Sequence, residues 1–332
     1  MNQSTFTVID MESLGGKHVD FKGKNLLGLR DLTRAEIEGI INLAVSYANS
    51  DPSKNNSLLA GKTLLSAFYQ PSTRTRLSHE AAMTQLGGRV IGFGDPKMTR
   101  AGDFYQESIK DTFGMLQNYA DIIVLRHFET GAPHEAAKWS RVPIINAGDG
   151  WGEHPTQVLT DLSTVVDRRG GLDGLNFLLV GDGRMRTMHS ICYALAKFNV
   201  SLSFVSPPEL TIPAAYLADF KSLGCDIQFV DDVKDALPDA DVIYMEPVVQ
   251  ADYASSRVER CDDVGVTAES YKIDLKKLLK YAKSDAMVLH SLPRMDELST
   301  DVDETKFAAY WEEAAMGVNL KKALFQLILL EK

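Results

Sequence analysis

The chain has 332 residues, of which 45% are hydrophobic and 24% are charged. This composition is typical of a globular protein, and the length is sufficient for two domains of ordinary size. The formal net charge of −10 at pH 7 argues against a nucleic-acid partner and against binding to an anionic membrane surface. No apolar run approaches the roughly 18–20 residues of a membrane-spanning helix. The first residues lack the basic and apolar segments of a secretory signal.

The three cysteines, Cys192, Cys225 and Cys261, include no Cys-x-x-Cys pair. Their spacing therefore predicts neither a zinc site nor a redox motif. So few cysteines, in an odd number, are typical of a protein in a reducing compartment, and we expect a cytoplasmic location. The simplest interpretation is that they are small, buried hydrophobic residues.

Predicted helices and strands alternate along the first half of the chain. Thr33 and Glu36 have the spacing of a helix-capping box, and apolar residues at helical spacing follow them. A second helix is predicted over 77–86, and the Gly87-Gly88 pair that follows is expected to end it. Such alternation indicates an α/β domain around a parallel sheet. The predicted strands are 62–69, 89–93, 121–125 and 142–147.

The same pattern restarts after Arg168-Arg-Gly-Gly171, which is typical of an interdomain turn. We therefore predict an α/β fold of two domains, each with a central, mainly parallel sheet flanked by helices. The expected domains are 1–165 and 166–310, and 311–332 is expected to return as a helix to the first domain. The cleft between such domains is the expected ligand site. The predicted elements of the second half are strands 175–180, 200–205, 226–230, 241–245 and 286–290 and helices 187–198 and 320–330.

The segment Ser72-Thr73-Arg74-Thr75-Arg76 follows a predicted strand and opens a helix. The backbone N–H groups and the helix dipole at such a place favour an anion. Guanidinium groups bind a phosphate through paired hydrogen bonds, and hydroxyl groups can donate to the remaining oxygens. A helix cap with solvated arginines is the alternative interpretation, but five such side chains in a row favour a phosphate site.

Three further polar segments lie near predicted strand ends. His154-Pro-Thr-Gln157 taken alone predicts a turn that caps a helix, although a neutral histidine there can donate to a carbonyl oxygen. His290-Ser-Leu-Pro-Arg294 lies at the carboxyl end of a predicted strand, where open α/β sheets bind ligands. Arg126 also follows a strand, and a single arginine in that place is most often a surface residue.

Gly181-Asp182-Gly183 follows a strand and is similar to the start of a dinucleotide-binding loop. The full G-x-G-x-x-G pattern requires a glycine where this chain has Arg186. A nicotinamide-dependent dehydrogenase is therefore disfavoured.

Together and in this order, these segments resemble the aspartate/ornithine carbamoyltransferase family. Ser72–Arg76 is similar to its STRTR carbamoyl-phosphate loop, Gln157 closes its HPTQ motif, and His290–Arg294 resembles the HPLPR segment of aspartate-type members. The resemblance runs from about Ser66 to the C-terminus. It implies a carbamoyltransferase that forms a homotrimer with shared active sites, in which segment 94–106 of one subunit reaches its neighbour.

The resemblance also implies how the reaction would proceed. The acceptor amine attacks the carbonyl carbon of carbamoyl phosphate, and an oxyanion develops that Thr75, Arg126 and His154 are expected to stabilise. No metal, cofactor or covalent nucleophile is needed. The expected catalytic residues are those three and Arg74, and the remaining ligands of carbamoyl phosphate are expected to be Ser72, Thr73, Gln157 and the backbone carbonyls near Leu292 and Pro293.

One departure from the aspartate-type pattern concerns the segment shared between subunits. Aspartate-type members carry a lysine there, shortly before a Gly-Glu-Thr, and this chain has no lysine at that position. Glu107–Thr112 instead resembles the ornithine-type ESxxDT. Lys97 and Arg100 are the nearby candidates to replace that lysine.

A second departure follows the predicted strand 241–245. Aspartate-type members have Thr-Arg-Val-Gln there, whose arginine binds the acceptor carboxylate, whereas this chain has Glu246-Pro-Val-Val-Gln250. A carboxylate suits a cationic group better than an anionic one. Arg186 matches the other carboxylate-binding arginine. The expected acceptor-site residues are Arg186, Glu246, Gln250 and Leu292.

Similarity over the whole chain places aspartate narrowly first as the acceptor. A cationic amine, such as ornithine or a diamino acid, is the alternative that Glu246 favours. Arg257 and Arg260 are candidates to replace the lost arginine. A non-catalytic binding or regulatory relative is a third hypothesis, which the retained oxyanion-stabilising residues disfavour. The sequence does not indicate whether regulatory chains attach.

Overall fold

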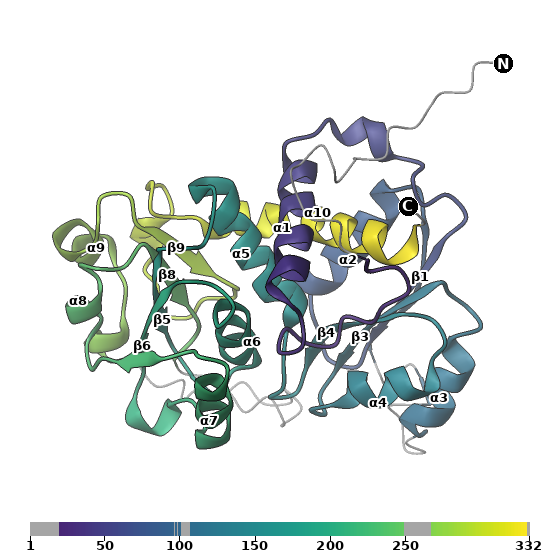
Figure 1. The fold of residues 1–332 in the computed structure, drawn as a ribbon, viewed down its shortest axis with the longest axis horizontal. Helices are drawn as coiled ribbons and strands as arrows, with labels where there is room; N and C mark the ends of the chain where they lie inside the picture. The colour runs from purple at the N-terminus through teal and green to yellow at the C-terminus, as the bar shows by residue number, and fades with distance from the viewer. Residues whose placement is uncertain (1–19, 96, 98, 101–106, 249–266, 331–332) are drawn as a thin grey trace. The chain divides into compact units, whose positions relative to one another are not determined.

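The computed structural model describes residues 20–95, 97, 99–100, 107–248 and 267–330. They form two compact units (Figure 1). Unit 1 comprises the described residues up to Ser163 and those from Ala315 onward, and unit 2 comprises those from Thr164 to Ala314. The predictions for Gln250, Arg257, Arg260, Cys261 and segment 101–106 lie outside the described residues.

Unit 1 is built on four parallel strands in the order β2-β1-β3-β4. The strands β1, β3 and β4 are almost entirely buried, because helices cover both faces of the sheet. The edge strand β2 is largely exposed. The strands are β1 (Thr63–Phe68), β2 (Arg89–Phe93), β3 (Ile122–His127) and β4 (Ile144–Asp149).

Figure 1 shows α3 and α4 on one side of this sheet and α1, α2 and the end of α10 on the other. Phe113 of α3 and Ala136 of α4 pack against Leu65 and Leu125 of the strands. The predicted capping box of α1 is present. The helices are α1 (Arg34–Ala48), α2 (Arg74–Gln85), α3 (Ile109–Leu116), α4 (Ala132–Trp139), α5 (Pro155–Arg169) and α10 (Tyr310–Leu329), with a 3₁₀ turn η2 (Pro52–Asn55).

The C-terminal helix packs on the first domain, as the sequence predicted. The ammonium group of Lys321 donates to the hydroxyl of Thr160 at 2.9 Å, and this lysine is only 3% exposed. The hydroxyl of Tyr47 donates to Gln326 at 2.5 Å. These bonds join α10 to α5 and α1 within unit 1.

Unit 2 is built on five parallel strands in the order β7-β6-β5-β8-β9. Figure 1 shows α6 and α7 on one side of the sheet and α8 and α9 on the other. The two-domain α/β prediction is thus confirmed. The strands are β5 (Asn176–Val180), β6 (Ser201–Val205), β7 (Ile227–Phe229), β8 (Val242–Met245) and β9 (Met287–His290). The helices are α6 (Arg186–Leu195), α7 (Ala214–Ser222), α8 (Val233–Ala236) and α9 (Leu275–Tyr281), with 3₁₀ turns η4 (Pro208–Leu210), η5 (Glu269–Tyr271) and η6 (Thr300–Val302).

In each sheet, the strand order reverses beside the strand that comes first in the chain. In unit 1 the chain passes from β1 to β2 on one side and returns to β3 on the other, and in unit 2 β5, β6 and β8 follow the same scheme. Open α/β sheets bind ligands at the carboxyl ends of the strands at such a reversal. The segment Ser72–Arg76 follows β1, and Arg126 is the second-last residue of β3. In unit 2, Gly181–Arg186 and Glu246 follow β5 and β8. Among the described helices, none combines the length and apolarity needed to cross a bilayer.

A substitution at Gly92 can test how closely the edge strand β2 packs on β1. Its φ of +147° is one that other residues rarely adopt, and a Cβ there would overlap the backbone of Ser66. We expect Gly92→Ala to destabilise the protein by about 1–3 kcal/mol. Gly114→Ala in α3 is the control, because a Cβ at Gly114 would meet no atom within 4 Å. Thermal unfolding should show a lower midpoint for the first variant only, and equal midpoints would contradict the close packing.

Candidate functional site

The first turn of α2 carries the predicted anion-binding motif. Its N-cap residue, Thr73, has helical dihedral angles (φ −78°, ψ −60°), and its hydroxyl makes no capping hydrogen bond. The helix begins at Arg74, three residues earlier than the 77 that the sequence predicted. Ser72 is half-buried, whereas Thr73 and Arg74 are exposed. The first-turn N–H groups, at the positive end of the helix dipole, can therefore meet an anion.

The two arginines of this motif have different environments. Arg76 donates from Nε to the carboxylate of Glu80 at 2.7 Å, one helical turn further on. The Arg74 side chain lies exposed at the first turn. Arg76 is thus engaged in an ion pair within α2, and Arg74 is the more exposed of the two arginines.

Thr75, Arg126 and His154 come from three elements and converge on one point in unit 1. The Nε2 atom of His154 lies 3.5 Å from Oγ1 of Thr75 and 3.4 Å from Nη1 of Arg126. Thr75 and His154 are buried, at 8% and 5% exposure. These distances are long for mutual hydrogen bonds, as is common where several groups are arranged to bind a shared ligand. Polar atoms of the three side chains thus lie close together in unit 1.

The other ring nitrogen of His154 also has a polar neighbour. Its Nδ1 lies 3.4 Å from the hydroxyl of Thr156, which can either donate to it or accept from it. These contacts are therefore compatible with both neutral tautomers. In the tautomer with the proton on Nε2, this N–H faces the same point as Thr75 and Arg126.

The loop that carries His154 is held by a buried polar network that the sequence did not reveal. The side chains of Asn146 and Asp149 are 0% and 2% exposed and bond to each other at 2.9 Å. The carboxylate of Asp149 also accepts from the backbone N–H groups of Gly131 at 2.6 Å and Glu153 at 2.9 Å. The Glu153 carboxylate in turn accepts from the N–H of Leu29 at 2.7 Å. These bonds fix the loop just before His154.

Gln157 has a carboxylate partner that orients its amide. The NH₂ group of Gln157 donates to Asp161 at 2.8 Å, one turn further along α5. An amide whose NH₂ group is bound in this way presents its oxygen as the acceptor. The amide oxygen is therefore suited to receive an N–H from a ligand.

His79 supports Thr75 from within α2. It is fully buried, and its Nδ1 lies 2.7 Å from the carbonyl oxygen of Thr75. Burial, together with the nearby charge of Lys321, lowers the pKa of His79 to about 3. The ring is therefore neutral and donates to that carbonyl. Because Lys321 lies on α10, the C-terminal helix helps to keep neutral the histidine that contacts the first turn of α2.

In unit 2, Arg186 is the first residue of α6 and is 5% exposed. The nearby Arg184 instead pairs with the buried carboxylate of Asp182 at 2.7 Å. Arg186, for which the sequence predicts a role in binding the acceptor, thus lies at the start of the helix that follows β5.

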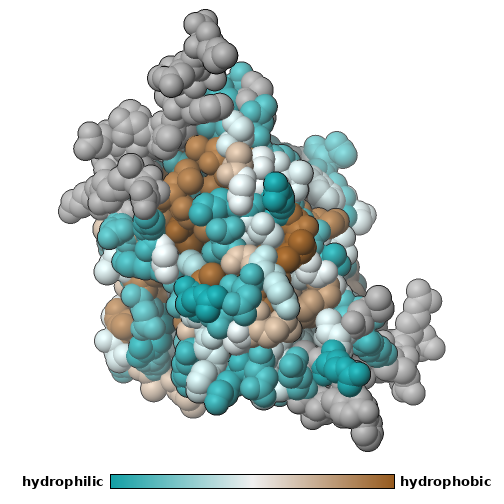
Figure 2. Space-filling view, turned by 90° about the vertical axis from the view of Figure 1, so that its right-hand side faces the viewer, coloured by the Kyte–Doolittle hydropathy of each residue, from teal (hydrophilic) through white to brown (hydrophobic). Residues whose placement is uncertain are grey.

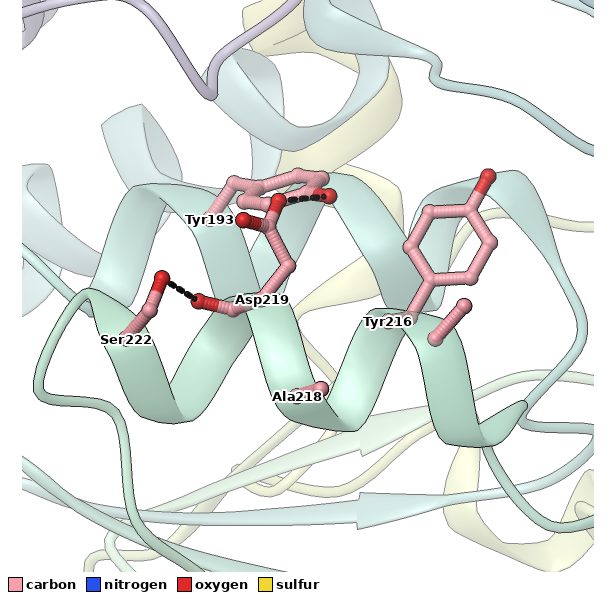
Figure 3. Close-up of a pocket in the computed structure, with 6 residues that line it drawn as sticks. Tyr193, Tyr216, Ala218, Asp219 and Ser222 are labelled. Carbon is pink, nitrogen blue, oxygen red and sulfur yellow. Dashed lines mark hydrogen bonds between the residues drawn. The ribbon is translucent and has the colours of Figure 1, made fainter.

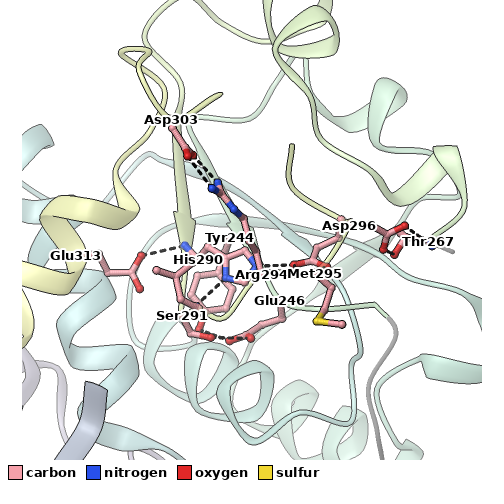
Figure 4. Close-up of polar contacts among 12 residues, drawn as sticks. Tyr244, Glu246, Thr267, His290, Ser291, Arg294, Met295, Asp296, Asp303 and Glu313 are labelled. Carbon is pink, nitrogen blue, oxygen red and sulfur yellow. Dashed lines mark hydrogen bonds and ion pairs between the residues drawn. The ribbon is translucent and has the colours of Figure 1, made fainter. Parts of the chain in front are cut away.

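Glu246 directly follows β8, and its side chain is fully buried. Its carboxylate accepts from the hydroxyls of Ser291 at 2.8 Å and Tyr244 at 3.2 Å (Figure 4). Burial raises the pKa of Glu246, while His290 and the hydroxyls of Thr187, Ser291 and Tyr244 act in the opposite direction. Glu246 is one of the acceptor-site residues predicted from the sequence, whereas its bond to Ser291 is visible only in the structure.

The segment after β9 is held by further buried carboxylates. The N–H of His290 donates to Glu313 at 3.0 Å, and Nε2 of His290 lies 2.8 Å from Glu297. Nδ1 of the same ring accepts from the N–H of Leu292 at 2.8 Å, which places the ring proton on Nε2. Leu292 has a positive φ of 54°, a conformation that these bonds maintain, and a cis peptide bond joins it to Pro293.

Arg294, the last residue of this motif, has a structural partner. Its guanidinium forms a two-pronged ion pair with Asp303, and one of the two bonds measures 2.6 Å. This pairing lowers the pKa of Asp303. The half-buried Leu292 and the exposed Pro293 remain the residues whose carbonyl groups can meet a ligand.

A cavity of about 520 Å³ lies elsewhere in unit 2, beside α6 and α7 (Figure 3). Tyr193 donates there to Asp219 at 2.8 Å. None of the residues that the sequence analysis selected lines this cavity. Over the described part of the chain, no group of three or more His, Cys, Asp or Glu side chains is arranged to hold a metal ion.

Comparison with protein families gives two matches that together span most of the chain. Residues 24–167 match the carbamoyl-phosphate-binding domain of aspartate/ornithine carbamoyltransferases, and residues 173–328 match their aspartate/ornithine-binding domain. The fold and these matches define the class as a two-domain α/β transferase.

Individual relatives are similar over nearly their whole length. The aspartate carbamoyltransferase catalytic subunit of Methanopyrus kandleri is 37% identical over 93% of this chain and 98% of its own, and that of Clostridium botulinum is 39% identical with the same coverage. The structure of aspartate transcarbamoylase from Trypanosoma cruzi in complex with carbamoyl phosphate and aspartate matches with a TM-score of 0.80. It is 30% identical and covers 93% of this chain and 98% of that one. The chain belongs to the aspartate/ornithine carbamoyltransferase family.

His127, beside Arg126, makes the stability of the protein depend on pH. It is 5% exposed, its Nδ1 accepts from the N–H of Glu129 at 3.0 Å, and burial lowers its pKa to about 4. An unfolded histidine titrates near 6.5, so between about pH 6.5 and 4 the unfolded chain binds a proton that the folded chain does not. Stability should therefore fall with decreasing pH by up to about 1.4 kcal/mol per unit for each such histidine.

His127→Asn keeps an acceptor for Glu129 and removes this titration. We expect denaturant unfolding across that pH range to show a shallower pH dependence for the variant. His134→Asn, at an exposed position, is the control. A slope unchanged by His127→Asn would contradict the assignment.

Proposed function

We propose that this protein transfers the carbamoyl group of carbamoyl phosphate to the amine of an amino acid, with aspartate as the first candidate. The observation that carries the proposal is the convergence of Thr75, Arg126 and His154 on one point, in the unit where α2 begins with an anion-binding turn. The names of the relatives support aspartate, since those proteins are aspartate carbamoyltransferases.

The proposed mechanism assigns the leaving phosphate to the first turn of α2. Ser72, Thr73 and Arg74 hold the phosphate together with backbone N–H groups. As the amine attacks the carbonyl carbon, Thr75, Arg126 and the Nε2–H of His154 donate to the oxygen that gains negative charge. The C–O bond to phosphate then breaks, and the amine loses a proton. Gln157, oriented by Asp161, accepts from the carbamoyl NH₂ with the backbone carbonyls of Leu292 and Pro293.

The residues proposed to bind the acceptor amino acid belong to unit 2. Arg186, at the start of α6, would bind a carboxylate of the amino acid. Glu246, Leu292 and Gln250 complete the proposed acceptor site. We accordingly propose unit 1 as the carbamoyl-phosphate-binding domain and unit 2 as the acceptor-binding domain.

A cationic amine is the second candidate acceptor, and Glu246 favours it. A fully buried carboxylate, followed by Pro247, stands where aspartate-type members have an arginine for the acceptor carboxylate. Ornithine or another diamino acid would bring a positive charge toward that carboxylate, which is the favourable combination.

We also propose that the protein forms a homotrimer. Leu77 on α2 and Ile91 on the edge strand β2 are 56% and 42% exposed. Figure 2 shows apolar residues gathered in patches on one face of the molecule. Exposed apolar patches commonly mark protein interfaces. Since β2 ends at Phe93, a contact through Ile91 would lie close to the start of the segment that the family resemblance implies is shared between subunits.

The cysteines support the proposed cytoplasmic location. Cys192 and Cys225 are buried and form no disulfide. Burial raises the pKa of Cys225 to about 11, so its thiol is inert. Free structural thiols of this kind are typical of a reducing compartment.

A carbamoylation assay tests the function. Purified protein would be supplied with carbamoyl phosphate and, separately, aspartate, ornithine, lysine, putrescine, diaminopropionate or asparagine, and the ureido product measured. We expect turnover with aspartate, and His154→Ala should lower kcat by about 100-fold or more. Turnover with a cationic amine alone would favour the second candidate. Phosphate binding without turnover of any amine would favour a non-catalytic relative.

The proposed trimer predicts a solution mass of three times 36.6 kDa. Light scattering after gel filtration measures it. Ile91→Asp should reduce the mass to that of a single chain, because it places a charge in the proposed apolar contact. Lys24→Asp, a charge change at an exposed position on a different segment, is the control. A monomeric wild-type protein would contradict the proposal.

A further inference from the structure

The carbonyl group of Thr75 accepts hydrogen bonds from two side chains of its own helix. The hydroxyl of Ser78 donates to it at 3.0 Å, and Nδ1 of His79 lies 2.7 Å from it. A carbonyl oxygen can only accept, so Nδ1 carries the proton of the neutral ring and donates it. Thr75 lies in the first turn of α2, so its carbonyl also belongs to the helical hydrogen-bond ladder. The oxygen is thus more heavily bonded than an ordinary helical carbonyl.

The ring of His79 leaves its second nitrogen as a buried acceptor. With the proton on Nδ1, Nε2 has only a lone pair, and it has no hydrogen-bond partner among the described residues. His79 is 0% exposed, and its ring meets the ring of Phe325 edge-on, with the centroids 6.1 Å apart. A buried polar atom without a partner costs free energy, and an apolar side chain would fill the same space without that cost. The feature that distinguishes a histidine here is its bond from Nδ1 to Thr75.

The bonded carbonyl shares its peptide group with the N–H of Arg76. A peptide group is a resonance-linked unit, so hydrogen bonds to its oxygen draw electron density from its nitrogen and make the N–H a stronger donor. The N–H of Leu77 donates to the carbonyl of Thr73 at 3.0 Å and begins the helical ladder. The N–H groups of Thr75 and Arg76 precede it and have no acceptor within α2. The N–H that is strengthened is therefore one of those that can meet an anion at the start of the helix.

We propose that His79 is a positioning residue for the phosphoryl group of the ligand, which acts through the Thr75–Arg76 peptide group without touching the ligand. Its imidazole N–H holds the carbonyl of Thr75 in place and strengthens the N–H of Arg76 toward a phosphate oxygen. Ser78 acts on the same carbonyl in the same way. The role assigned to His79 rests on the proposed binding of carbamoyl phosphate at the start of α2.

Calorimetric titration with inorganic phosphate tests this role without requiring turnover. His79→Phe fills the same space but removes the donor, and it should raise the Kd for phosphate about fivefold. His79→Asn places an amide N–H near the position of Nδ1 and should restore most of the affinity. Ser78→Ala removes the second donor, at a half-buried position, and should raise the Kd about twofold to threefold.

Phe325→Leu is the matched control for a role in folding alone. It loosens the packing around the ring of His79 but leaves Nδ1 and its bond untouched. We expect a lower thermal unfolding midpoint for this variant and a phosphate Kd close to that of wild type. Phosphate binding unchanged by both His79→Phe and Ser78→Ala would overturn the inference. So would equal weakening in His79→Phe and Phe325→Leu, because the effect would then follow stability.

Steady-state kinetics relate this role to the proposed function. If the wild-type protein transfers the carbamoyl group, His79→Phe should raise the KM for carbamoyl phosphate about fivefold and leave the KM for the amine unchanged. A rise confined to the amine KM would contradict the role of His79. If the wild-type protein binds phosphate but turns over no amine, the proposed transfer fails, and the phosphate titration still decides the role of His79. A wild-type protein that binds no phosphate would overturn both.

Discussion

Buried carboxylates hold the irregular segments of both units, and the rest of the polar architecture depends on them. A carboxylate removed from water must find hydrogen-bond donors, and loops are rich in N–H groups that no regular structure uses. Asp149 binds the N–H groups around the loop before His154, and Glu313 and Glu297 bind those around Leu292 and Met295. Because these bonds are out of solvent, removing one partner leaves the other unsatisfied, so the loops have little freedom.

The two units differ in the polar groups that they present at the carboxyl ends of their strands. In unit 1, a helix N-terminus, Arg74, Arg126 and Thr75 supply donors, which suits phosphate and a developing oxyanion. In unit 2, Arg186 at the start of α6 supplies donors, and the Glu246 carboxylate and the carbonyl groups near Leu292 supply acceptors, which suits a molecule that carries both a carboxylate and an amine. This division matches the proposed reaction, in which an anionic donor molecule and a nitrogen nucleophile need different surroundings.

Several features could be predicted because their causes are local in sequence. Apolar runs and helical spacing located every strand of both sheets, and the capping box placed α1. The start of α2 was predicted three residues late, because Arg74 to Arg76 lack the apolar spacing that marked the rest of that helix. The proximity of Thr75, Arg126 and His154 was implied only by family resemblance. Their spacing along the chain predicts nothing about distance.

The sequence alone determined the α/β class, the family and the residue types available for chemistry, since these follow from periodicity, composition and short motifs. Only the tertiary structure decided how those residues are paired. Glu246 and Ser291 are 45 positions apart and Lys321 and Thr160 are 161 apart, and both pairs meet because parallel strands and the returning C-terminal helix bring distant segments together. The direction of the Ser291 hydroxyl proton depends on such a distant partner, and no local pattern encodes it, whereas the orientation of Gln157 depends on Asp161, only four positions away.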